Sequence, residues 1–241
     1  MFTKLIKDKA EQISYSQNEL NNIAATLSNL KSIINKEPDF GAPFLGGSYK
    51  RATMVKGVSD VDVYFRYSGS GYSQVALAKL KARLMECYPN TTVKQDKPSL
   101  LVDFEKIPIN ITPYKEDSVG NLSIPDNYLQ YWKSINFGEL ENLIIRLRQK
   151  NPKFIDLIKI LKLWNFNYKK GIKNYEIERK VCNLFLSPFS VSSTLTDLPD
   201  WLWTYMSNNG FQAEASKIHS MMLMSTGDYL KSEWAMFINK K

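Results

Sequence analysis

The feature that most constrains the fold is a stretch in which valines alternate with polar residues, VSDVDVYF at positions 58–65. A β-strand directs successive side chains to opposite faces, so Asp60 and Asp62 share one face while the valines between them point into a core. Two neighbouring carboxylates repel each other, which is costly on a buried face unless a cation lies between them. Mg²⁺ prefers such hard oxygen ligands. The alternation therefore predicts a strand with a metal site, against the ordinary alternative of a solvent-exposed edge.

A glycine-rich turn precedes this strand. Gly46 and Gly47 allow the backbone to approach a ligand closely, and the N–H groups and the Ser48 hydroxyl of the turn suit a phosphate group. Eleven residues separate Ser48 from Asp60. Either motif alone is weak, but the turn, the spacing and the acid pair together are more specific. A net charge of +8 also suits phosphate-bearing partners, without distinguishing nucleotides from nucleic acid or an anionic surface.

The first half of the chain favours a mixture of helices and strands. Residues 2–35 predict two helices, because Ser16 and Glu19 have the spacing of a capping box between two apolar stripes. We also expect a helix at residues 73–87 and strands at residues 91–94, 99–104 and 107–114. The last two of these strands would form a hairpin.

From residue 122 onward the pattern is mainly helical, with few strand signals. We therefore expect an α+β fold with two lobes. The first lobe, residues 1–121, would hold the N-terminal helices and a mixed-sheet palm. The second, residues 122–241, would be helical, with a central cleft between the two.

One helix of the second half is expected to be buried. An Asn-Pro step at residues 151–152 favours a helix start, and the following residues are apolar on nearly all sides. The polar residues of this helix recur at every third position, as Asp156, Lys159, Lys162 and Asn165. A buried lysine requires an anionic partner. A triphosphate would be the anionic partner of Lys162, and Asp156 would be that of Lys159. We therefore expect Lys162 to bind a ligand and Lys159 to have a structural role.

Two further motifs narrow the interpretation. Residues 161–164 (LKLW) and 174–178 (NYEIE) resemble the Lys-x-Trp helix and the (Ser/Gln)-Tyr-x-Leu-Glu helix of oligoadenylate synthetases and bacterial cyclic-oligonucleotide synthases (CD-NTases). The Gly-Ser turn and the Asp-x-Asp strand are similar to those of the DNA polymerase β-type nucleotidyltransferase superfamily, which includes that class. The resemblance extends, with gaps, from the first helix to residues 234–237. It implies a polymerase β-like palm and a helical second lobe.

The resemblance also implies roles for individual residues. Those implicated in nucleotide binding are Gly47, Ser48, Lys162, Asn174 and Tyr175. Lys162 would contact the donor triphosphate, Asn174 would lie near it, and Tyr175 would stack on a base, with a core aromatic as the alternative for Tyr175. Asp60 and Asp62 would bind the catalytic magnesium (Mg²⁺) ions, with Mn²⁺ as a second candidate metal.

The superfamily has a third acidic residue, but this sequence has no carboxylate at the corresponding position. Residues 109–113, INITP, resemble the apolar-Asp-apolar-x-Pro strand that bears it, and Asn110 occupies the acid's position. An amide oxygen can bind a metal but brings no charge and cannot act as a base. Three explanations are open: a natural variant that works with two acids, substitution by Asp103, or a deliberate exchange of an aspartate. Asp103 could equally be an ordinary polar residue of the hairpin.

Composition excludes several classes. Two cysteines, Cys87 and Cys182, and the single His219 are too few for a zinc site within one chain. We expect two buried free thiols and a structural histidine. Neither a signal-peptide pattern nor an apolar run of membrane-spanning length is present. The expectation is a cytoplasmic protein with no membrane partner.

Together these features predict a template-independent, Mg²⁺-dependent nucleotidyltransferase. It would join nucleoside triphosphates into short cyclic or linear oligonucleotide signals in bacterial anti-phage defence, with a separate effector protein as a further candidate partner. Two alternatives remain open. The nucleotide could be transferred to a tRNA end or to a partner protein, or Asn110 could make the chain a catalytically silent nucleotide-binding module.

Overall fold

The computed structural model of the 241-residue chain describes residues 1–96, 98–104, 107–126, 128–186, 197–224 and 227–239. The helices and strands group into two compact units. The palm unit comprises Tyr15–Ala52 and Ser59–Glu139, and the helical unit comprises Met1–Ser14, Thr53–Val58 and Leu140–Lys241.

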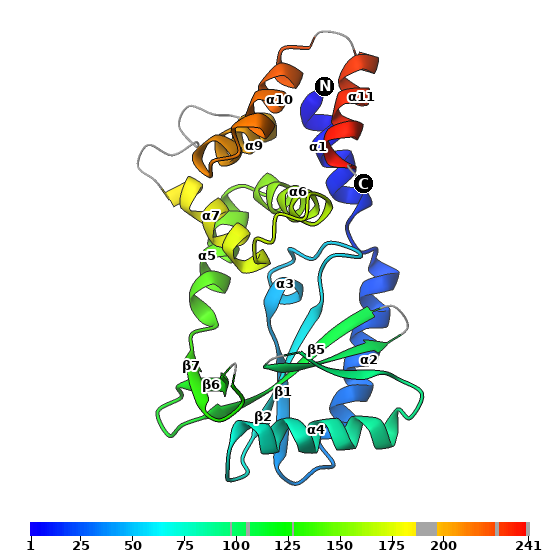
Figure 1. Cartoon of the computed structure of the whole chain (residues 1–241), viewed down its shortest axis with the longest axis vertical. Coiled ribbons are helices and arrows are strands. Elements are labelled where there is room, and N and C mark those ends of the chain that lie inside the picture. Colours follow the sequence, from blue (N-terminus) through cyan, green and yellow to red (C-terminus); the bar gives the residue numbers. More distant parts are fainter. Residues whose placement is uncertain (97, 105–106, 127, 187–196, 225–226, 240–241) are drawn as a thin grey trace. The chain divides into compact units, whose positions relative to one another are not determined.

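The palm unit is built on a mixed sheet (Figure 1). The described strands are β1 (Phe40–Leu45), β2 (Val61–Tyr67), β3 (Val93–Asp96), β4 (Ser99–Phe104), β5 (Ile107–Glu116), β6 (Leu122–Pro125) and β7 (Trp132–Ile135). Their order is β1-β2-β5-β4-β3, with β6 paired to β5 and β7 paired to β6. β2 and β5 pair in parallel, while the other neighbours are antiparallel. The predicted hairpin and the strand of the acid pair are confirmed.

The helices of the palm unit are α2 (Gln17–Ile34), α3 (Gly47–Lys50) and α4 (Ser73–Cys87). The predicted capping box is present at the start of α2, where Ser16 Oγ accepts from the Glu19 N–H at 3.3 Å and Glu19 Oε2 accepts from the Ser16 N–H at 2.8 Å. Both α2 and α4 pack against the sheet (Figure 1). The apolar side of β2 is buried, with Val61 and Phe65 both 0% exposed.

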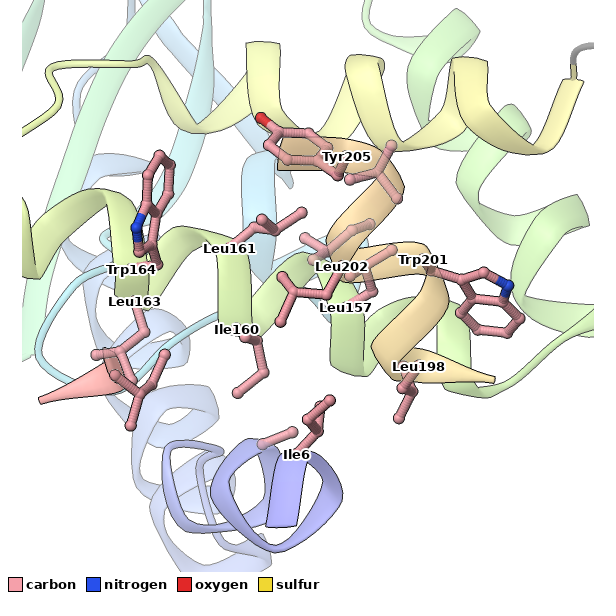
Figure 2. Close-up of a cluster of buried hydrophobic side chains, with 14 of the residues drawn as sticks. Ile6, Leu157, Ile160, Leu161, Leu163, Trp164, Leu198, Trp201, Leu202 and Tyr205 are labelled. Carbon is pink, nitrogen blue, oxygen red and sulfur yellow. The ribbon is translucent and has the colours of Figure 1, made fainter. Parts of the chain in front are cut away.

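The helical unit surrounds α6 (Lys153–Asn167). The other described helices that belong to it are α1 (Phe2–Gln12), α5 (Gly138–Lys150), α7 (Asn174–Leu186), α9 (Leu198–Asn208), α10 (Gln212–Met222) and α11 (Gly227–Ile238). Figure 2 shows the side chains of α6 between Ile6 of α1 and Leu202 and Tyr205 of α9. Burial on nearly all sides of α6 confirms the prediction for this helix.

The division into units differs from the predicted boundary between residues 121 and 122. β6 and β7 continue the sheet from β5, so the palm unit extends to Glu139. Helix α1 was assigned to the palm lobe but belongs to the helical unit, because its apolar side packs against α6. The short strands β1, β6 and β7 were not predicted from the sequence.

Cys87 and Cys182 are both free, as expected, but Cys87 is partly exposed rather than buried. Within the described part of the chain, no helix has both the length and the apolar character that spanning a membrane would require.

Candidate nucleotide site

Pairing of β1 with β2 brings the glycine turn to the acid pair. The two strands are antiparallel, with Leu45 opposite Val63, so the end of β1 lies beside the start of β2. The turn that follows β1 is joined to β2 by a hydrogen bond from the Gly46 N–H to the Asp62 carbonyl oxygen at 3.1 Å. The two motifs, separated by eleven residues in the sequence, therefore meet at one end of the sheet.

Gly47 is packed directly against the acid pair. Its φ is +60°, a left-handed conformation that side chains disfavour. A Cβ at this position would lie 1.7 Å from Asp62 Oδ2, far inside any allowed contact. Glycine is therefore required here by both backbone conformation and space.

Ser48 follows in the first turn of α3 and is 8% exposed. Its Oγ donates to the Asp60 carbonyl oxygen at 3.4 Å. The structure thus places Gly47, Ser48, Asp60 and Asp62 together in the palm unit. Their binding of a triphosphate and of metal stays a prediction.

Asn110 lies beside both acids. The parallel pairing of β2 and β5 sets Asp62 opposite Asn110, and the Asn110 Nδ2 donates to Asp60 Oδ2 at 3.0 Å. On the other side, Asn110 Oδ1 lies 3.5 Å from Ser99 Oγ on β4, whose hydroxyl donates to the Asp96 carbonyl oxygen at 2.8 Å. The amide therefore directs its NH₂ group toward Asp60, where a third carboxylate would be repelled.

Burial has the largest effect on the pKa of the Asp60 carboxyl and raises it. The hydrogen bond from Asn110 lowers this pKa, and the charge of Asp96 raises it further, so the net direction is upward. A cation between Asp60 and Asp62 would oppose this effect, because an adjacent positive charge favours the ionised form.

The donor atoms of this face fit a hard divalent cation. Within the described residues, no three His, Cys, Asp or Glu side chains are grouped in a way that could hold a metal ion. Asp103 on β4 is exposed, lies opposite Pro108 of β5, and does not complete such a group. Two carboxylates, Asp60 and Asp62, remain as oxygen ligands of the kind Mg²⁺ prefers. The site has one negative charge fewer than a site with three acids.

An aromatic cluster continues the same face of the sheet. Tyr64 follows Asp62 by two residues, so the two side chains share a face. The Tyr64 ring stacks on Phe44 of β1 with centroids 4.9 Å apart, and it meets Phe137 edge-on at 4.5 Å. All three rings are partly exposed. Such rings offer a stacking surface for a base, and the sequence alone did not reveal them because β1 was not recognised.

Lys162 has a carboxylate partner within the helical unit. It is 0% exposed, and its Nζ donates to Glu178 Oε1 at 2.6 Å and to the Thr53 carbonyl oxygen at 3.0 Å. The anion beside this lysine in the helical unit is the Glu178 carboxylate, and the contact of Lys162 with a triphosphate stays a prediction. Glu178 was visible in the sequence as the last residue of the NYEIE motif, but nothing there identified it as the partner of Lys162.

Asn174 and Tyr175 begin α7 in the helical unit. The Tyr175 side chain is 49% exposed, and its hydroxyl donates to Glu176 Oε1 at 3.3 Å. Tyr175 is thus not a core aromatic, and its ring has a free surface. Its stacking on a base, and the proximity of Asn174 to a triphosphate, stay predictions.

Residues 1–143 match the family described as Second Messenger Oligonucleotide or Dinucleotide Synthetase domain. The chain belongs to this synthetase family. The family is one of nucleotidyltransferases, as predicted from the turn and the acid pair. A curated relative, the cyclic AMP-AMP-AMP synthase of Acinetobacter sp. (strain ATCC 27244 / 9458), is 25% identical over 190 residues. The match covers 71% of this chain and 55% of the relative, so the chain spans about half the length of that protein.

Solved structures show the same synthetase fold. CdnC of E. coli MS115-1 with ATP has a TM-score of 0.78 at 15% identity, covering 99% of this chain and 98% of that one. The CdnC:HORMA-deltaN complex from the same source has a TM-score of 0.77 at 15% identity, covering 98% and 96%. These likenesses confirm the predicted α+β nucleotidyltransferase fold with a helical C-terminal part.

Proposed function

We propose that this chain is a synthetase that joins nucleoside triphosphates into short oligonucleotide signals, cyclic or linear. The observation that supports the proposal most strongly is the Gly47-Ser48 turn packed against Asp60 and Asp62 in a chain of the synthetase family. A bacterial anti-phage role in the cytoplasm is part of the proposal. ATP is the first substrate to test, because the curated relative is a cyclic AMP-AMP-AMP synthase and a solved neighbour contains ATP.

The proposed chemistry assigns each side chain a task. Backbone N–H groups of the turn and Ser48 Oγ bind phosphate oxygens of the donor. Tyr175 has an exposed ring on which a base would stack. Asp60 and Asp62 would hold Mg²⁺ or Mn²⁺, which when bound supplies positive charge to the triphosphate. Asn110 fixes the Asp60 carboxylate through its NH₂ group.

In the reaction itself, the 3′-oxygen of an acceptor nucleotide forms a bond to the α-phosphorus of the donor. The bond between that phosphorus and the bridging oxygen breaks, and pyrophosphate leaves with the electron pair. The hydroxyl proton passes to solvent water, and the amide at position 110 does not take part as a base. Positioning and charge stabilisation therefore supply the rate enhancement.

The test is to incubate the purified full chain with single and mixed nucleoside triphosphates and Mg²⁺ or Mn²⁺, and to resolve the products by mass spectrometry. The proposal expects short oligonucleotides and pyrophosphate, both lost in an Asp60→Asn, Asp62→Asn double variant. Absence of product from the chain and from Asn110→Asp would contradict it. Label from ATP appearing on RNA or protein in a lysate would instead support transfer to a macromolecule. A rise in melting temperature with ATP but no pyrophosphate would support a silent binding module.

A protein partner is a second element of the proposal. A solved neighbour of similar fold forms a complex with HORMA-deltaN. We expect this chain likewise to act with a separate effector protein. Co-purification with proteins encoded beside it would test this expectation.

A further inference from the structure

The segment between the turn and the acid pair belongs to the helical unit. Residues Thr53–Val58, hereafter the strap, are part of that unit although both flanking motifs are in the palm unit. Val55 is fully buried in the hydrophobic core of the helical unit, and Val58 packs against the same core. The Lys56 N–H donates to the Ile13 carbonyl oxygen at 2.8 Å. The strap is therefore held along its length by the helical unit.

A buried polar group fixes the first residue of the strap. Lys162, Thr53 and Glu178 are each 0% exposed. Lys162 Nζ donates to the Thr53 carbonyl oxygen at 3.0 Å, to Thr53 Oγ1 at 3.1 Å and to Glu178 Oε1 at 2.6 Å. Thr53 Oγ1 in turn donates to Glu178 Oε1. The three side chains close a ring of hydrogen bonds, hereafter the clamp, around one residue of the strap.

The backbone just before the clamp is strained. Ala52 has φ +57°, a conformation that L-residues other than glycine rarely adopt. Such a conformation persists where the surrounding structure determines it. Here the Ala52 N–H donates to the Tyr49 carbonyl oxygen at 3.1 Å on one side, and the clamp holds Thr53 on the other.

We propose that the clamp positions the nucleotide site by fixing the strap, and that Lys162 acts on nucleotide through Thr53 rather than by contact. Val58 lies two residues before Asp60, a length of chain that spans at most about 7 Å and leaves little slack. Thr53 lies five residues after Ser48. Lys162, Thr53 and Glu178 are thus positioning residues, and this inference rests on the proposed function.

A pair of variants at Thr53 separates the clamp from direct contact with nucleotide. Thr53→Val keeps the shape but removes the hydroxyl, whereas Thr53→Ser keeps the hydroxyl. We expect Thr53→Val and Lys162→Met each to lower kcat/KM for ATP at least tenfold, and Thr53→Ser to restore it to within threefold of the parent chain. Because Thr53 and Lys162 belong to the same clamp, their effects should not add. The kcat/KM of the Thr53→Val, Lys162→Met double variant should be no more than threefold below that of the poorer single variant.

Lys159→Met provides the matched control on the same helix. Its Nζ donates to Ser14 Oγ at 2.7 Å and takes no part in the clamp, and its loss should leave kcat/KM within threefold of the parent value. If Thr53→Val keeps full kcat/KM while Lys162→Met loses it, Lys162 contacts the nucleotide directly and the clamp proposal is overturned.

Hydrogen exchange gives a readout that does not need activity. In Thr53→Val, peptides that cover residues 46–64 should exchange faster than in Thr53→Ser, while peptides of α4 stay unchanged. Unchanged exchange at 46–64 would overturn the clamp whether or not the chain makes a product. A chain that makes no product but shows this exchange pattern would contradict the proposed function and leave the clamp supported.

Discussion

At position 47, an added Cβ would lie 1.7 Å from the Asp62 carboxylate oxygen, on a backbone with φ +60°. Gly47→Ala must therefore adopt a left-handed conformation that disfavours alanine by about 1–2 kcal/mol, and must also displace Asp62. We expect a loss of stability larger than the backbone effect alone, together with loss of ATP binding and turnover. Urea denaturation and calorimetric titration with ATP would measure these effects.

Gly120→Ala is the matched control for Gly47. Its φ is +85°, and a Cβ there would meet nothing within 4 Å. It should lose stability through the backbone effect alone, about 1–2 kcal/mol, and keep ATP binding. Equal losses of stability in Gly47→Ala and Gly120→Ala would show that contact with Asp62 is unimportant.

Asn110→Asp tests the missing third acid. A carboxylate beside Asp60 and Asp62 would repel both in the absence of metal, and would bind a divalent cation more tightly. We expect lower stability without metal and a turnover with Mg²⁺ at least tenfold higher than in the parent chain. Asn110→Ala removes the amide without adding charge and should show no gain. A gain in Asn110→Ala equal to that in Asn110→Asp would contradict the role of charge.

Individual residues were predictable where a local motif determined them. The turn and the acid pair, with Asp60 just before β2 and Asp62 within it, follow from spacing and alternation, and the two motifs lie side by side. The partner of Lys162 could not be predicted, because a buried lysine requires an anion but its sequence position does not say which one. Glu178 lies sixteen residues later on another helix, and Thr53 lies 109 residues earlier.

Among the elements, the start of α9 depends on one carboxylate. Asp197 accepts from the Leu198 N–H at 2.9 Å, from Lys153 Nζ at 3.2 Å and from the Thr3 hydroxyl. Burial alone would raise the pKa of the Asp197 carboxyl, but these hydrogen bonds outweigh it and lower the pKa. A lowered folded-state pKa contributes stability above the ordinary value of about 3.9, and this stability is lost as pH falls through the folded-state pKa.

Asp197→Asn should therefore keep the helix cap but make the unfolding free energy depend less on pH in the acid range. The difference in unfolding free energy between the parent chain and this variant should be largest near pH 7 and shrink below about pH 4. Asp197→Ala, which also removes the cap, should lose about 1 kcal/mol more. Urea denaturation at pH 7 and pH 3 would measure this, and a difference independent of pH would contradict the assignment.

Elements with strong periodicity or caps were predicted well. The capping box defines the start of α2, and the predicted helix at residues 73–87 coincides with α4. β1 was missed because Gly41 and Pro43 are rare in strands. β1 is an edge strand with an irregular register near these residues, and edges tolerate proline. The four-residue strands β6 and β7 are too short to show alternation.

At the scale of the whole molecule, two units share one interleaved chain. The helical unit contains Trp164, Trp201, Trp203 and Trp234, while Trp132 is in the palm unit. Tryptophan fluorescence therefore reports mainly on the helical unit, and far-UV circular dichroism reports on both. Because the strap connects two parts of the palm, we expect the units to unfold together.

Leu80→Ala tests this coupling from within the palm unit. Leu80 is 0% exposed, and its truncation should cost about 2–5 kcal/mol. The fluorescence midpoint in urea should fall together with the circular dichroism midpoint. A fluorescence midpoint equal to that of the parent chain would show that the units unfold independently.

The way in which the chain passes back and forth between the two units could not be predicted from the sequence. The expected boundary followed the change from mixed to mainly helical sequence patterns near residue 122. Such patterns predict where helices and strands lie along the chain but not how they pack. The assignment of α1 to the helical unit depends on contacts with residues more than 140 positions away, such as Phe2 with Trp234. The strap has no periodicity that would distinguish it from a palm loop.

Glu178 lies 125 residues beyond Thr53, the residue it holds. At about 5–20 residues per second, a ribosome needs roughly 6–25 seconds to add it after Thr53. For most of that interval the nascent chain has both the glycine turn and the acid pair, but Val55 has no helical core to enter. On the clamp proposal, synthesis therefore orders the events: Thr53 is held only after α7 has been made, and a chain released earlier should make no product.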